Sequence, residues 1–148
     1  MKIKDILIHK GSDVITVSSR ASLHEAFCKI NETKVGALVV VDEPGQCGGI
    51  ITERDLMREL YQNTHLQSKQ VQEIMTRDVV IGDPCDKIEN VMAKMTEGRF
   101  RHLPVCKNGI LVGIVSIGDV VKAALHQANS QVSQLRDYVT GVADVPAI

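Results

Sequence analysis

The stretch GIVSIGD, residues 113–119, recurs earlier in the chain as GIITERD, residues 49–55. Both copies contain Gly, two β-branched residues, a hydroxyl residue, two variable positions and then Asp. A match in order and chemistry over a whole heptapeptide indicates two copies of one structural unit.

The repeat extends outward from these heptapeptides. KDIL (4–7) resembles QEIM (72–75), and residues 14–30 resemble residues 79–95 in their apolar positions. Within the longer pair, apolar residues at i, i+3, i+4 and i+7 predict one amphipathic helix per copy. They are Leu23, Ala26, Phe27 and Ile30 in the first copy, and Ile88, Val91, Met92 and Met95 in the second.

Both predicted helices have start signals. Ser22 with Glu25, and Asp86 with Glu89, have the spacing of an N-cap side chain and its N3 partner. Short apolar runs and turn residues follow, so each unit is predicted to be a short strand, a helix, a strand, a turn, a strand and a helix. We expect the glycine that opens each heptapeptide to serve a turn.

The composition argues against several classes of partner. The 148 residues are 44% hydrophobic and 24% charged, with a net charge of −1, as in ordinary soluble proteins. Nucleic acid is not expected as a partner, because such proteins usually cluster Lys and Arg. No apolar run approaches the roughly 20 residues that span a bilayer, and MKIKDILIHKG lacks the apolar core of a signal peptide. We therefore predict no membrane association and a cytoplasmic location.

The four cysteines lie far apart and form no C-x-x-C pair. This spacing favours reduced thiols over a disulfide framework or a metal site. We expect most of them to be small core residues.

One unit of about 60 residues buries a sheet and two helices poorly by itself, so two units are expected to share one core. The predicted parts are a first repeat at 1–62, a linker at 63–70, a second repeat at 71–126, and a C-terminal helix and frayed tail at 127–148. The terminal helix has apolar positions at three- and four-residue spacing: Leu125, Ala128, Val132, Leu135 and Val139. A single chain would leave part of this apolar face exposed, so we predict a symmetric homodimer.

The sequences KVGALVVVD…GGIITERDLMREL and VQEIMTRDVV…RFRHLPVCKNGILVGIVSIGDVV resemble the two repeats of a CBS domain pair, the cystathionine β-synthase motif. The resemblance covers residues 1 to about 126, and HQANSQVSQLRDYVTG resembles the terminal helix of stand-alone CBS-pair proteins. It implies an α/β (α+β) fold in which two repeats pack about a pseudo-twofold axis, called a Bateman module. It also implies an adenosyl ligand, such as AMP, ATP, NAD or S-adenosylmethionine, in clefts between the repeats, and frequent dimers.

The heptapeptides allow two interpretations. Ser116 with Asp119, like Thr52 with Asp55, has the spacing of a helix N-terminus, with a hydroxyl cap and an acid in the first turn. Capping alone accounts for both copies. Alternatively, the free N–H groups of the helix attract phosphate while the carboxylate accepts both hydroxyls of a ribose. Duplication and the family resemblance favour nucleotide binding.

The resemblance implies two sites, each pairing the Asp of one repeat with the early strand and the helix-to-strand junction of the other. The first would contain Thr52, Arg54, Asp55, Val79, Val80, Phe100, Arg101 and His102. The second would contain Ser116, Asp119, Val14, Ile15, Val35, Gly36 and Ala37. Apolar side chains would flank the adenine while backbone groups read its edge.

The two predicted sites differ in charge. Gly118 stands where the first repeat has Arg54, and Arg99, Arg101 and His102 mark an anion-facing edge at the first site. The alternatives are solvated strand ends for Arg101 and His102, and a helix-surface ion pair for Arg54. We expect the first site to prefer phosphorylated ligands and the second to discriminate less, unless a cation from elsewhere in the chain or from a dimer partner reaches it.

Catalytic signatures are lacking in the sequence. IVSIG has Ile114 where a nucleophile elbow requires Gly, and no Walker P-loop or H-E-x-x-H appears. His102 and Cys106 have no further ligands at metal spacing. We predict a regulatory sensor, not an enzyme, that binds an adenine nucleotide and modulates an unknown partner protein. The alternative is a dimeric adaptor that works without a ligand.

Overall fold

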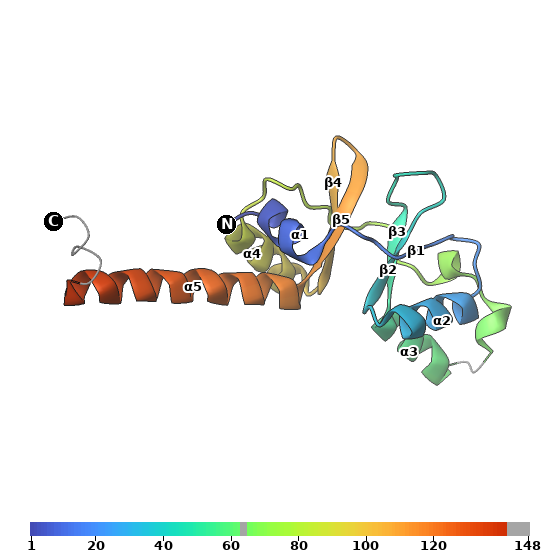
Figure 1. The fold of residues 1–148 in the computed structure, drawn as a ribbon. Coiled ribbons are helices and arrows are strands. Elements are labelled where there is room, and N and C mark those ends of the chain that lie inside the picture. Colours follow the sequence, from blue (N-terminus) through green and yellow to red (C-terminus); the bar gives the residue numbers. More distant parts are fainter. Residues whose placement is uncertain (63–64, 142–148) are drawn as a thin grey trace.

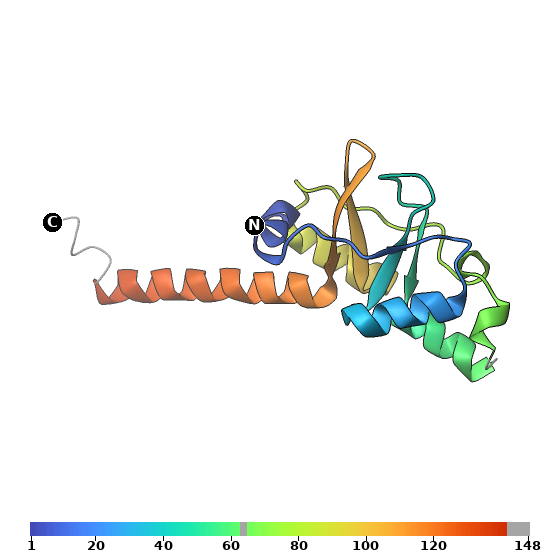
Figure 2. The same cartoon turned by 45° about the vertical axis from the view of Figure 1, so that its right-hand side comes forward.

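The computed structural model describes residues 1–62 and 65–141 and contains two mixed α/β units followed by a long helix (Figures 1 and 2). The first unit contains β1 (Thr16–Val17), α2 (Leu23–Thr33), β2 (Ala37–Val40), β3 (Gly49–Thr52) and α3 (Glu53–Gln62). The second contains α4 (Ile88–Gly98), β4 (His102–Lys107), β5 (Ile110–Ser116) and α5 (Ile117–Thr140). Outside them lie α1 (Ile3–Lys10) and the 3-10 helices η1 (Leu66–Ser68) and η2 (Val71–Glu73). The predicted fold class is confirmed.

The sheets of the two units are small and unequal. In the first unit β2 lies between β1, which is parallel to it, and β3, which is antiparallel. In the second unit β4 and β5 form an antiparallel pair. The first strand predicted for the second repeat is wrong, because only a single bridge between Gly82 and Val105 forms there. Pro84 follows two residues later, and a proline cannot donate to a sheet ladder.

Each unit is completed by a short segment from outside it. α1 packs on the second unit, where the N–H of Ile3 donates to the carbonyl of Asp86 at 3.0 Å. η2 packs on the first unit in the equivalent way, and the N–H of Val71 donates to the carbonyl of Ala21 at 2.8 Å. This exchange explains why KDIL and QEIM match. Each segment precedes one unit in the sequence and packs on the other unit.

The hydrophobic core consists of two clusters, so the single shared core predicted from the sequence is wrong. One cluster joins α1 to the second unit: Ile3, Ile6, Ile88, Val91, Met95, Leu103, Val105, Val115 and Val120. The other joins η2 to the first unit: Val17, Leu23, Ala26, Ile30, Leu38, Val40, Ile51, Leu56 and Val71. Because α1 and η2 cover apolar faces that each unit would otherwise expose, each unit closes its own core. The surfaces where the units meet therefore lie outside both clusters.

One of the two predicted N-caps is confirmed. The hydroxyl of Ser22 accepts a hydrogen bond from the N–H of Glu25 at 3.1 Å. The prediction for Asp86 is wrong, because α4 begins after Lys87 and has no side-chain cap. The carboxylate of Asp86 instead accepts from the N–H of Asp83 at 2.9 Å, which closes the turn before the helix.

The glycines of the heptapeptides lie in strands, so the prediction that they serve turns is wrong. A Cβ atom on Gly49 would lie 2.7 Å from the carbonyl oxygen of Thr76, and one on Gly113 would lie 2.8 Å from Leu7. Both distances are shorter than van der Waals contact. Glycine is therefore required at these positions because neighbouring segments approach the strand closely.

The cysteines do not occupy the core, so that prediction is also wrong. Cys28, Cys47 and Cys106 are half-buried and Cys85 is exposed, and all four are free thiols. In β4, for example, the buried Val105 directly precedes Cys106, and successive strand residues point to opposite faces.

α5 is continuous from Ile117 to Thr140; its first turns pack on the second unit through Val120, and its C-terminal part projects away from both units (Figures 1 and 2). It therefore crosses the boundary between 126 and 127 that the sequence suggested. Residues 63–64 of the predicted linker and 142–148 of the predicted tail lie outside the described residues. No helix in the described part of the chain combines the length and hydrophobicity needed to cross a membrane.

Candidate functional site

A cavity of about 740 Å³ lies between the two units, within the size range of small-molecule sites. The structure brings all eight residues predicted for the first site to its lining: Thr52, Arg54, Asp55, Val79, Val80, Phe100, Arg101 and His102. They come from the end of β3 and the start of α3, from the segment before α4, and from the α4–β4 junction. Arg99, which the sequence placed at an anion-facing edge beside this site, also lines the cavity. Further lining residues, which sequence reasoning missed, are Ile50, Glu53, Met57, Arg58, Thr76, Asp78 and Gly98.

Asp55 caps α3 with only one of its carboxylate oxygens. Its Oδ2 accepts from the N–H of Thr52 at 2.9 Å, while its own N–H donates to the Thr52 hydroxyl at 3.2 Å. Its Oδ1 lies 3.9 Å from the guanidinium of Arg58, which is too far for a hydrogen bond. Capping therefore leaves Oδ1 available to a ribose hydroxyl, and the two interpretations of the motif are compatible.

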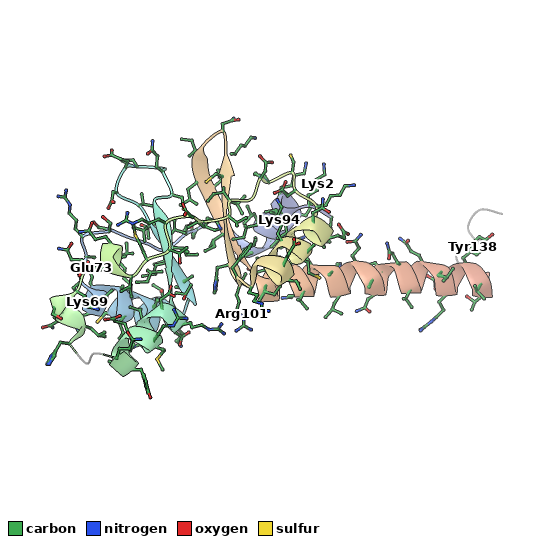
Figure 3. The ribbon with its side chains drawn as sticks, turned by 180° about the vertical axis from the view of Figure 1, so that it is seen from behind. Lys2, Lys69, Glu73, Lys94, Arg101 and Tyr138 are labelled. Carbon is green, nitrogen blue, oxygen red and sulfur yellow. The ribbon has the colours of Figure 1, made fainter. Side chains whose placement is uncertain are left out.

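Four arginines give the cavity its capacity for anions: Arg54, Arg58, Arg99 and Arg101. All four are exposed, so their guanidinium groups can reorient toward a phosphate. Figure 3 shows Arg101 between the two units. Arg58 follows Arg54 by one helical turn, and this i, i+4 spacing is the sequence signal that could have identified it.

His102 stands where the two units touch. Its Nε2 would lie 2.9 Å from a Cβ atom on Gly36, so any side chain at that position would displace the imidazole. Gly36, which the sequence assigned to the second site, thus lines the first cavity beside His102. Burial lowers the pKa of His102, and the positive charges of Lys10 and Arg101 lower it further.

The lowered pKa of His102 predicts a loss of stability in mild acid. The unfolded chain takes up a proton near pH 6.5, whereas the folded protein resists protonation at this site. The stabilising contribution is therefore present above the unfolded pKa and is lost as the pH falls toward the lower folded pKa. Urea unfolding at pH 7.5 and pH 5 should show a larger loss for the wild type than for His102→Gln.

The control for this measurement is His9→Gln, which alters an exposed histidine of α1. It should retain the wild-type difference between the two pH values. An equal loss of unfolding free energy in wild type and His102→Gln would contradict the prediction.

Asp119 is the counterpart of Asp55 in the second unit and caps α5 in the same way. Its Oδ2 accepts from the N–H of Ser116 at 2.9 Å, and its N–H donates to the Ser116 hydroxyl at 3.1 Å. The ammonium of Lys10 also donates to Oδ2, at 2.6 Å, and to the carbonyl of Ile114 at 2.8 Å. Burial raises the pKa of Asp119, but the bonds from Lys10 and Ser116 outweigh it and hold that pKa below its ordinary value.

Lys10 brings a cation to Asp119, whereas the second repeat has Gly118 where the first has Arg54. No local motif predicts this contact, because Lys10 and Asp119 are far apart in the sequence. The remaining residues predicted for the second site lie mainly in the first unit's interior. Ile15 and Val35 pack against its core, Ala37 is buried at the start of β2, and Val14 is half-buried before β1.

The comparisons with known proteins agree with this architecture. The family model described as CBS domain matches residues 3–62 and 71–126. The chain is 35% identical to the CBS domain-containing protein CBSX3, mitochondrial, of Arabidopsis thaliana, over 94% of this chain and 72% of that protein. It is 44% identical to the CBS-domain containing protein ATU1752 from Agrobacterium tumefaciens, whose crystal structure superposes with a TM-score of 0.79 over 84% of this chain and 99% of that one.

A further solved structure contains ligands. The CBS domain pair of protein MJ0100, in complex with 5-methylthioadenosine and S-adenosyl-L-methionine, is 31% identical, with a TM-score of 0.76 over 86% of this chain and 98% of that one. The two segments that match the family model contain the first structural unit, the second unit as far as residue 126 within α5, and both heptapeptides. The chain therefore belongs to the CBS domain family and contains two CBS repeats.

Proposed function

We propose that the protein is a regulatory module that binds an adenosine-containing ligand between its CBS repeats and thereby modulates a partner protein. The observation that carries this proposal is the cavity that joins Asp55 of the first repeat to Phe100 and Arg101 of the second. Asp55 keeps Oδ1 for a ribose, Phe100 offers an apolar face to an adenine, and the arginines can bind phosphate. The MJ0100 complex with two adenosine derivatives supports this ligand class.

Among AMP, ATP, NAD and S-adenosylmethionine, the first cavity favours the phosphorylated ligands. Its four arginines outnumber the three acidic lining residues, Glu53, Asp55 and Asp78. S-adenosylmethionine carries a cationic sulfonium and no phosphate, so it gains less from guanidinium groups. The ligand would act by binding more tightly to one of two arrangements of the protein.

A thermal-shift series with adenosine, AMP, ATP, NAD and S-adenosylmethionine tests the proposal. A ligand at about 100 times its Kd should stabilise the folded protein by about 2.7 kcal/mol, and the phosphorylated ligands should act at lower concentrations than adenosine. Calorimetric titration should give matching affinities. If no adenosine derivative shifts the melting temperature or releases heat, the proposed function is wrong.

The proposed role is regulatory and not catalytic. The Ser116 hydroxyl acts as the N-cap of α5, and in the described part of the chain no hydrogen bond joins it to His102. Within residues 1–62 and 65–141 no group of three or more His, Cys, Asp or Glu side chains is placed to hold a metal ion. A cytoplasmic location stays a prediction from the sequence, and the Arabidopsis relative is described as mitochondrial.

A homodimer is part of the proposal, and α5 supports it. Its exposed apolar residues are Val121, Leu125, Val132, Leu135 and Val139. The same face favours the alternative function, a dimeric adaptor that works without a ligand. The two functions differ in one respect: an adaptor would dimerise and bind its partner equally well when Asp55→Ala and Asp119→Ala are combined, whereas a sensor would lose its response to nucleotide.

A further inference from the structure

The two aspartates proposed to bind ribose have different surroundings. Among residues 1–62 and 65–141, the Oδ2 of Asp55 accepts one hydrogen bond, from the N–H of Thr52. The Oδ2 of Asp119 accepts two, from the N–H of Ser116 and from the ammonium of Lys10. A ribose that uses both oxygens of the carboxylate therefore competes with a hydrogen-bonded ammonium at Asp119. At Asp55 the guanidinium of Arg58 lies 3.9 Å from Oδ1 and forms no such bond.

Lys10 is held in place by the fold but remains accessible. It is the last residue of α1, whose Ile3 and Ile6 are buried in the second unit's core. Its ammonium also donates to the carbonyl of Ile114, which fixes its direction. The Lys10 and Asp119 side chains are 35% and 26% exposed, so an incoming ligand can reach the pair, and ion pairs open to water are weak enough to be exchanged.

We propose that Lys10 and Asp119 belong to a second nucleotide site between the repeats, called the second cleft, and that Lys10 determines its ligand preference. This inference rests on the proposed binding of adenosine derivatives. A nucleoside without phosphate must displace Lys10 from Asp119 and offers it no anion in return. A nucleotide gives the displaced ammonium a phosphate, so one charge-assisted bond replaces another. Lys10 therefore weakens the binding of adenosine and preserves that of AMP.

The test is calorimetric titration of AMP and adenosine into Asp55→Ala, which leaves the second cleft as the adenosine site. In this background AMP should bind more tightly than adenosine. Adding Lys10→Met keeps the length of the side chain and removes its charge. The substitution releases Asp119 and removes the cation that would meet the phosphate. The ratio of the Kd for adenosine to the Kd for AMP should therefore fall by at least about fivefold.

Two variants control this experiment. Lys4→Met removes the same charge from an exposed position of the same helix and should leave the ratio unchanged. Lys10→Arg keeps a cation and should retain most of the preference for AMP, which a merely structural role of Lys10 would not explain. Urea unfolding of each variant shows whether the fold is intact.

The outcomes separate this inference from the proposed function. If the adenosine-to-AMP ratio is unchanged in a folded Lys10→Met protein, the role of Lys10 is wrong, although the protein still binds nucleotides. If Asp55→Ala binds no nucleotide while the wild type still does, the role of Lys10 is also wrong, because the second cleft is then not a binding site. Absence of binding in the wild type removes the proposed function itself.

Discussion

Replacement of Asp55 by alanine is expected to weaken the binding of AMP to the first cavity by about 30- to 150-fold. This corresponds to about 2–3 kcal/mol, the range for hydrogen bonds to a charged acceptor. The effect should appear in an Asp119→Ala background, in which the first cavity is the remaining proposed site. Calorimetric titration with AMP would measure it, and Asp55→Asn should lose less because it keeps a hydrogen-bond acceptor.

Capping must be separated from ligand binding in this test, because Asp55→Ala also removes the bond from the N–H of Thr52. Asp5 provides a control, since its Oδ2 accepts from the N–H of Lys2 at 2.8 Å at the start of α1, as the Oδ2 of Asp55 does from the N–H of Thr52. Asp5→Ala should destabilise the protein by about 1 kcal/mol, as loss of a cap does, and leave AMP affinity unchanged. If both substitutions reduce stability but neither weakens AMP binding, Asp55 is a cap and the ribose contact is disproved.

The features predictable from the sequence are those set by local hydrogen bonding and by the repeat. The heptapeptide specifies a strand followed by a capped helix, because Thr52 and Asp55, or Ser116 and Asp119, satisfy each other's backbone groups within three residues. The repeat then brings the start of α3 to face the α4–β4 junction. The lining of the first cavity follows from these two facts together with the family resemblance.

The features that sequence reasoning missed depend on contacts between distant segments. Lys10 reaches Asp119 only because α1 packs on the second unit and not on its own. Gly49 is required by the carbonyl of Thr76, a residue that follows η2 and belongs to the other exchanged segment. Asp86 has the spacing of a cap, but its carboxylate instead accepts a hydrogen bond from the N–H of Asp83. Spacing alone therefore does not decide between competing local hydrogen bonds.

α5 carries the second large prediction, because its apolar residues follow the repeat of a coiled coil. Leu125, Val132 and Val139 are seven residues apart, and Val121, Ala128 and Leu135 form the second series of the same heptad. A 24-residue helix is about 36 Å long, and its distal part, where Tyr138 lies, projects free of both units (Figure 3). Such a segment is only marginally helical in water by itself. A second copy of α5 offers the same heptad seam and would cover it.

We therefore expect the protein to sediment at twice its chain mass of 16.2 kDa at micromolar concentration, and the double substitution Leu125→Glu with Leu135→Glu to dissociate it. Leu125 and Leu135 are 59% and 64% exposed in the single chain, so the two units of the variant should fold normally and keep the wild-type midpoint in urea unfolding. Each leucine buried in the dimer contributes about 1.5–3 kcal/mol, and a glutamate there adds the cost of an unpaired charge. Ser130→Glu with Gln134→Glu adds the same charge away from the seam and should leave the dimer intact. Sedimentation of the wild type as a monomer, or of the leucine variant as a dimer, would show that α5 does not join the two copies.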